Sequence, residues 1–101
     1  MITKKLRNGI VDYVYNQINS VELIINNNTV SATIQQMKKN TDSIDIYVDV
    51  LLSDPNDIIN GIAVYNSSNQ LLARDLPNLT YNVQSATYIY RLKVIGKNGI
   101  L

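Results

Sequence analysis

The chain of 101 residues contains no histidine, no cysteine, no tryptophan and no phenylalanine. Histidine and cysteine supply most of the acid/base, nucleophilic and transition-metal chemistry that proteins carry out near neutral pH. Their absence excludes disulfides and cysteine-ligated zinc, so the burial of apolar side chains must stabilise the fold. Paired carboxylates are the one catalytic device that the composition allows, and we expect neither a cofactor nor enzymatic activity.

Charge is also scarce and nearly balanced. Charged residues make up 17% of the chain, and nine Lys/Arg against eight Asp/Glu leave a formal charge of +1. A nucleic-acid-binding domain carries a strong basic excess, so nucleic acid is not an expected partner. Because no run approaches 18 apolar residues and residues 1–16 lack the apolar core of a signal peptide, we expect no membrane partner and a chain that is soluble and intracellular when made.

Two residue types are abundant. Asparagine occupies 14 positions, and tyrosine, with seven, is the sole aromatic residue. Asparagine side chains bond to nearby backbone and tolerate left-handed conformations, which is typical of turns. Tyrosine combines apolar area with a hydroxyl that needs a partner, so it suits half-buried sheet faces and interfaces.

Apolar residues recur every fourth position between residues 2 and 18. This spacing predicts a helix with one buried stripe, formed by Ile2, Leu6, Ile10, Val14 and Ile18, with Val11 and Tyr13 alongside. Gly9 weakens the helix by about 1 kcal/mol, and the local alternation of apolar residues from Val11 to Tyr15 would also suit a strand.

After residue 20 the pattern changes to short apolar runs separated by polar clusters, which predicts antiparallel strands. Residues 21–25 and 29–34 flank three consecutive asparagines and form a first hairpin, whose tip suits positive φ. Residues 35–43 are predicted to be a mobile polar loop. Residues 58–65 and 70–74 flank the tetrapeptide Asn-Ser-Ser-Asn and form a second hairpin.

Residues 44–52 and 87–95 alternate most clearly between apolar and polar positions. On the polar face of the first segment lie Asp45 and Asp49, and Arg91 and Lys93 lie on that of the second. Opposite charges across neighbouring strands stabilise a sheet by a few tenths of a kcal/mol per pair, so we predict that these two strands are neighbours.

Together these patterns predict a single α+β domain that is mostly β, with an N-terminal helix followed by an antiparallel sheet or small β-sandwich of about six strands. Residues 1–19 form the helix and arm, residues 20–95 the β region, and residues 96–101 a C-terminal tail. The tail ends in Ile100 and Leu101, so it is either a loose terminus or a docking arm.

No residue pattern indicates a catalytic or metal site. Asp45 and Asp49 lie about 13 Å apart on one strand face, beyond the roughly 5 to 9.5 Å that glycoside hydrolysis uses. Asp54 and Asp57 bracket a turn but lack the distal glutamate of a calcium loop, so turn capping explains them. The candidate contact residues are instead the exposed tyrosines, loop asparagines and apolar end: Tyr65, Asn66, Asn69, Tyr81, Ile100 and Leu101.

Two segments resemble small virion proteins of tailed phages that infect low-GC Gram-positive bacteria. Residues 6–13 (LRNGIVDY) running into residues 20–30 (SVELIINNNTV) are similar to the opening helix and hairpin of those proteins, and residues 62–73 (IAVYNSSNQLLA) to their recurrent strand, tip and return. Where those proteins usually carry an Asp-x-x-Gly tip, this chain has Asn-Ser-Ser-Asn. The resemblance implies a non-catalytic structural subunit of the virion, associated with the tail or capsid, that contacts other virion proteins and copies of itself.

Two other functions fit the same composition. A glycan- or receptor-binding module at a tail tip would use the same exposed tyrosines and asparagines, because aromatic platforms also bind sugars. A small soluble regulator or inhibitor would be absent from purified particles.

Overall fold

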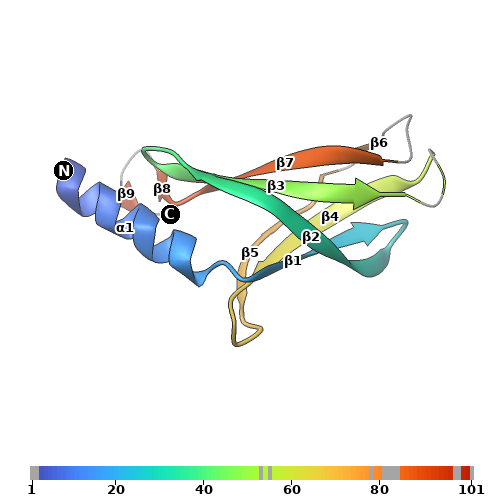
Figure 1. The fold of residues 1–101 in the computed structure, drawn as a ribbon, viewed down its shortest axis with the longest axis horizontal. Helices are drawn as coiled ribbons and strands as arrows, with labels where there is room; N and C mark the ends of the chain where they lie inside the picture. Colours follow the sequence, from blue (N-terminus) through green and yellow to red (C-terminus); the bar gives the residue numbers. More distant parts are fainter. Residues whose placement is uncertain are drawn as a thin grey trace.

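The protein consists of one N-terminal helix followed by an antiparallel β-sheet, as Figure 1 shows. The computed structural model describes residues 3–52, 54, 56–77, 79–80, 85–96 and 99–100. The helix is α1 (Lys4–Gln17). The strands are β1 (Ser20–Ile25), β2 (Asn28–Lys39), β3 (Ser43–Leu51), β4 (Ile58–Tyr65), β5 (Leu71–Asp75), β6 (Leu79–Thr80), β7 (Ser85–Lys93), β8 (Ile95–Gly96) and β9 (Gly99–Ile100).

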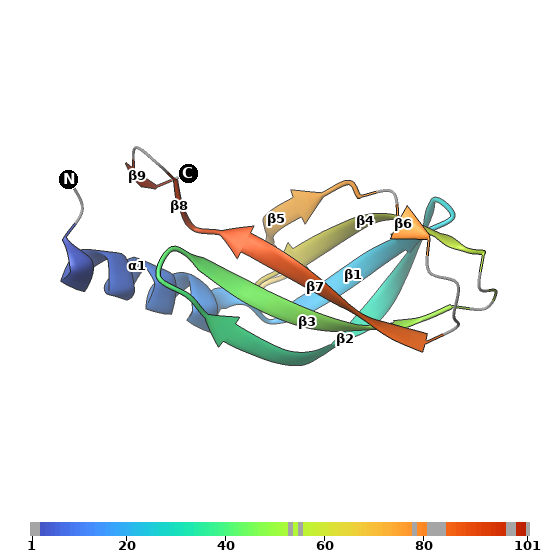
Figure 2. The same ribbon diagram turned by 90° about the horizontal axis from the view of Figure 1, so that it is seen from above.

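Six strands form one antiparallel sheet in the order β5-β4-β1-β2-β3-β7, and the short β6 pairs with β4. The sheet curls into a half-barrel whose edge strands are β5 and β7 (Figure 2). The predicted class, α+β and mostly β with about six strands, is confirmed, and the strands form a curled sheet in place of a sandwich. β8 and β9 form a separate two-stranded hairpin.

Among the described residues, three β-bulges interrupt the ladders of this sheet. At each bulge one strand has an extra residue, which falls between two successive residue pairs of the ladder. The extra residues are Gln35 in β2, Asn60 in β4 and Leu72 in β5. A bulge bends its strand and increases the local twist, so these positions favour the curl of the half-barrel. A bulge also shifts the alternation of side chains by one residue, which matters for what the sequence could predict.

The buried apolar residues form one cluster. Its largest fully buried members come from three strands, β1, β3 and β4, and are Val21, Leu23, Ile44, Ile46, Val48, Val50, Ile59, Ile62 and Val64. The predicted apolar face of residues 44–52 is thus confirmed. Tyr88 and Tyr90 of β7 are half-buried against the same cluster, as expected for tyrosines at the edge of a core.

The tip of the β1-β2 hairpin is built by asparagines in left-handed conformation, as the sequence predicts. Asn26 and Asn27 have φ of 50° and 67°. The Asn26 side chain donates to Asp57 Oδ1 at 2.7 Å and accepts from the Ile58 amide at 3.0 Å, while the Asn27 amide donates to Asn60 Oδ1 at 2.8 Å. These bonds tie the hairpin tip to the start of β4.

The prediction of a mobile loop over residues 35–43 is wrong. β2 continues to Lys39 and pairs with β3 as far as Ile44, so only residues 40–42 connect the two strands. The bulge at Gln35 puts Ile34 and Met37, three residues apart, on the same side, and both pack against the core. The run therefore lacks the alternation that identifies a strand.

The helix is confirmed, but its buried stripe is only partly as predicted. Thr3 caps the N-terminus, because its hydroxyl accepts a hydrogen bond from the Leu6 amide at 3.2 Å. Val11 and Ile18 are buried, whereas Leu6 is 55% exposed and Tyr13 66% exposed. The helix runs past the end of the sheet, so its N-terminal half has little sheet to pack against (Figure 1). Ile2 lies outside the described residues.

The predicted neighbourhood of the two long strands is confirmed, and one of the two charge pairs forms. Asp45 lies directly opposite Arg91 in the β3-β7 ladder. Asp49 lies opposite Thr87 instead of Lys93, and its carboxylate accepts a hydrogen bond from the Gln35 side chain at 3.0 Å. The strand register shifts the second pair apart.

Candidate functional site

Tyr65, a predicted contact residue, lies at the end of β4 and is half-buried. Its hydroxyl bonds to the carboxylate of Glu22 on the neighbouring strand β1, and this bond and its charge raise the pKa of the tyrosine. The side chain borders a hollow of about 350 Å³ together with Ser20, Glu22 and Ala32. Tyr65 therefore borders this hollow with its hydroxyl already bonded to Glu22, which lines the same hollow.

Asn66, the next predicted contact residue, is 9% exposed and serves its own loop. Its side-chain oxygen accepts from the backbone amides of Ser68 and Gln70, both at 2.9 Å, and its amide donates to the Gln70 side chain at 2.9 Å. These bonds turn the side chain into the loop, so Asn66, predicted as a contact residue, is buried in the free protomer.

Asn69 is exposed at the tip of the same loop with φ of 60°. Its backbone amide donates to the Asn66 carbonyl at 3.0 Å. Of the loop residues predicted as contacts, Asn69 is the one whose side chain faces outward beside Tyr65, and both border the same hollow.

The remaining predicted contact residues are only partly described. Tyr81 and Leu101 lie outside the described residues. The backbone of Ile100 pairs with Ile95 in the β8-β9 hairpin, so this part of the tail folds back on its own chain.

A polar junction joins α1 to the β2-β3 hairpin. Lys39 Nζ lies 2.9 Å from Asp12 Oδ1 and 5.1 Å from the centroid of the Tyr15 ring. Asp12 and Lys39 also line a hollow of about 420 Å³ with Asn8, Asn40 and Thr41. Both ionic groups are about half exposed, so the junction positions the helix and contributes little to stability.

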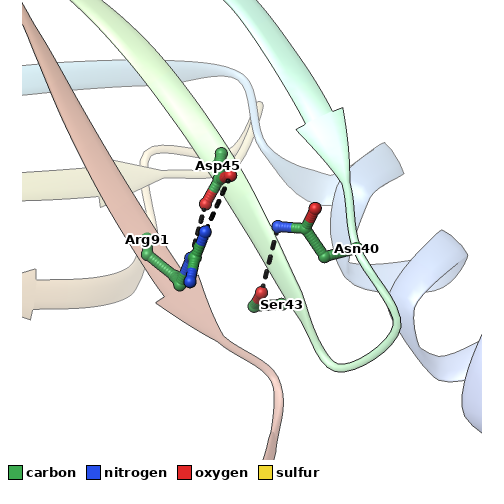
Figure 3. Close-up of polar contacts among 4 residues, drawn as sticks. All are labelled: Asn40, Ser43, Asp45 and Arg91. Atoms are coloured by element: carbon green, nitrogen blue, oxygen red, sulfur yellow. Dashed lines mark hydrogen bonds and ion pairs between the residues drawn. The ribbon is translucent and has the colours of Figure 1, made fainter.

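A second ion pair, between Asp45 and Arg91, joins β3 to β7 near the same end of the sheet (Figure 3). Arg91 Nε donates to Asp45 Oδ1 at 2.8 Å and its Nη2 donates to Oδ2 at 3.3 Å. This bidentate bond outweighs the effect of burial and lowers the pKa of Asp45, with a further hydrogen bond from Asn40. The pair stabilises the neighbouring strands and offers no open position for a ligand.

Large apolar side chains are exposed on and near the edges of the sheet, a feature that the list of predicted contacts missed. They are Leu51, Leu71, Leu72, Leu76 and Ile89, and Leu51 is 80% exposed. The signal was present in the sequence, because Leu51 and Ile89 occupy the outward positions of strands that alternate. Edge strands with unpaired backbone groups and apolar side chains are typical of surfaces that other chains cover.

A second exposed apolar surface lies on the helix. Thr3, Lys5, Leu6, Gly9, Ile10, Tyr13 and Val14 line a shallow hollow of about 760 Å³. The lining is almost entirely apolar. The signal in the sequence was the seven-residue separation of Leu6 and Tyr13, which puts both on one side of a helix.

Among the described residues no three carboxylates lie close enough to hold a metal ion. The one helix of the described part has 14 residues and does not meet the length and apolarity needed to cross a membrane.

Comparison of the chain with protein-family models, with curated proteins and with solved structures found no match.

Proposed function

We propose that the protein is a non-catalytic structural subunit of a phage virion, associated with the tail or the capsid, that holds neighbouring subunits by protein-protein contacts. The proposal combines the resemblance carried by residues 6–13, 20–30 and 62–73 with the surfaces of the half-barrel. Its partners are other virion proteins and further copies of the chain.

The observation that carries the proposal is the exposure of apolar side chains along the open edges of the sheet. Ile89 projects from the edge strand β7 and is 52% exposed, and Leu71 on the opposite edge strand β5 is 53% exposed. An edge strand with outward apolar side chains is a site for pairing with another chain. Covering such edges in an assembly would stabilise both partners.

Mass spectrometry of purified particles of the phage that encodes the chain tests this proposal. We expect the protein in stoichiometric amounts, bound through washes at high salt because apolar contacts resist screening. Absence of the protein from particles would contradict the proposal and favour a soluble regulator.

Cryo-electron microscopy of the same particles separates assembly from recognition. We expect Leu71 and Ile89 to be covered by neighbouring subunits. A distal position at a tail tip, with Tyr65 and Asn69 open to solvent, would instead support glycan or receptor binding.

A further inference from the structure

We propose that α1 packs antiparallel against α1 of a second copy of the chain, through a helix face formed by Leu6, Gly9, Ile10 and Tyr13. The inference rests on the assembly role proposed above and adds one partner to it. Sheet edges remain available for other subunits in such a dimer.

The helix face is apolar and largely exposed over the N-terminal half of α1. Leu6 and Tyr13 are 55% and 66% exposed, and they border the apolar hollow on the helix, while Ile10 lies between this hollow and the core. The helix extends lengthwise from the sheet, as Figures 1 and 2 show, so its N-terminal half projects beyond the end of the half-barrel. Contiguous apolar surface of this kind marks an interaction site.

Charge selects a second copy as the occupant and fixes its direction. Lys5 and Asp12 are seven residues apart, so they lie on the same flank of the helix face, about 10 Å apart along the axis. In an antiparallel pair related by a two-fold axis, this flank meets the same flank of the partner. Each Lys5 then faces Asp12 of the other copy, whose half-exposed carboxylate already binds Lys39 of its own protomer on one side, and two further ion pairs form around the axis. A parallel pair would separate these charges.

Gly9 lies close to the midpoint between Lys5 and Asp12, where the two-fold axis would pass. Among the residues that the structure describes, nothing lies within 4 Å of a Cβ atom placed at Gly9, so none of them requires glycine there. Glycine is unfavourable inside an exposed helix. Its absence of a side chain allows two helix axes to approach closely, since the interaxial distance depends on the side chains at the crossing.

Sedimentation velocity and light scattering of the purified full chain test the inference. We expect a monomer-dimer equilibrium. The charge reversal K5D places a second carboxylate against Asp12 of the partner copy, and we expect it to raise the dimer Kd about tenfold, as the loss of two exposed ion pairs and their replacement by repulsion implies. The matched control is K4D, which changes the same charge about 100° around the helix and should leave the Kd within about twofold.

A double-mutant cycle adds a readout that misfolding cannot imitate. D12K alone should also weaken the dimer, whereas K5D combined with D12K restores opposite charges across the axis and should recover most of the affinity. Asp12 also binds Lys39 within the protomer, so thermal unfolding followed by circular dichroism must show each variant folded. Equal Kd values for K5D and K4D, or no recovery in the double variant, would overturn the pairing.

Apolar contact is tested by L6Q, with V30Q as control because Val30 is exposed beside the β1-β2 hairpin, at the end of the sheet away from α1 (Figure 1). We expect L6Q to raise the dimer Kd at least tenfold and V30Q to leave it unchanged. A chain that stays monomeric at millimolar concentration would overturn the inference. A monomer that instead binds vesicles of anionic phospholipid through Lys4 and Lys5 would also overturn it, because the partner of the helix would then be a lipid surface. If the protein is monomeric in solution but present in particles, only the α1 pairing is contradicted. If it is a dimer in solution but absent from particles, only the virion role is contradicted.

Discussion

Asp45 on β3 and Arg91 on β7 lie directly opposite each other and share two hydrogen bonds, but their side chains differ in exposure. The Asp45 side chain is 9% exposed and that of Arg91 is 63% exposed. The buried partner is therefore the anion, and the exposed cation lies on its solvent side. Removing Arg91 is therefore expected to destabilise the protein more than removing Asp45, because an unpaired buried charge costs more than an unpaired exposed one.

We predict that R91Q lowers the midpoint of thermal unfolding, since the substitution leaves the buried Asp45 carboxylate without its charged donor. The matched control is K93Q, which removes a cation from the same face of β7, where Lys93 lies opposite Ser43. Thermal unfolding at pH 7 measures both variants. A midpoint for R91Q no lower than that of K93Q would show that the pair adds nothing to the sheet.

The same pair makes stability depend on pH below 4. Arg91 holds the pKa of Asp45 below its usual value of 3.8. The stabilisation is therefore present above about pH 4, and it is lost as the pH falls through the lowered pKa of the folded protein. We predict that D45N is less stable than the natural protein at pH 7 but loses less stability on acidification. Urea unfolding from pH 7 to pH 2.5 measures this, with D42N as a control at an exposed carboxylate.

The alternation of residues 44–52 was enough to predict one long strand and its buried face, because no bulge interrupts that run. The opposite charges on the polar faces of residues 44–52 and 87–95 were also enough to predict that β7 lies next to this strand. The register was not predictable: Asp49 has Thr87 opposite it, since cross-strand position depends on the length of the connection and not on charge. The curl of the sheet was missed for the same reason as the extension of β2, namely that each bulge inserts one residue and breaks the period of two.

The candidate site was predicted only by residue type. Asn66 and Asn69 have the same side chain and lie in the same loop, yet one is 9% exposed and the other faces solvent. Which of them turns inward depends on hydrogen bonds across four residues, and the sequence does not specify these. The exposed helix face was missed because a fourfold spacing places successive residues about 40° further around a helix. The stripe from Leu6 to Ile18 consequently turns away from the sheet at its N-terminal end.

The strand extension through Met37 gives a direct test of the bulge. Met37 lies opposite Ile46 and packs against the core, whereas Gln36 lies opposite Tyr47 and is exposed. We predict that M37N lowers the free energy of unfolding by about 1–2 kcal/mol, because it places an amide against apolar side chains. Q36N should change it by less than about 0.5 kcal/mol. Urea unfolding measures both, and equal effects would mean that residues 35–39 form a loop.

The loop at Asn66 distinguishes a structural asparagine from a contact asparagine. N66A removes three hydrogen bonds at a buried position and leaves two backbone amides without their acceptor, so we expect a loss of about 1–3 kcal/mol in the free energy of unfolding. N69G is the matched control: glycine accepts a φ of 60° without strain, so stability should change by less than about 0.5 kcal/mol. Urea unfolding gives both values, and incorporation into particles is measured in parallel. If N66A kept full stability but failed to assemble, Asn66 would be a contact residue after all; if N69G kept full stability and failed to assemble, the contact would lie at the exposed tip beside Tyr65.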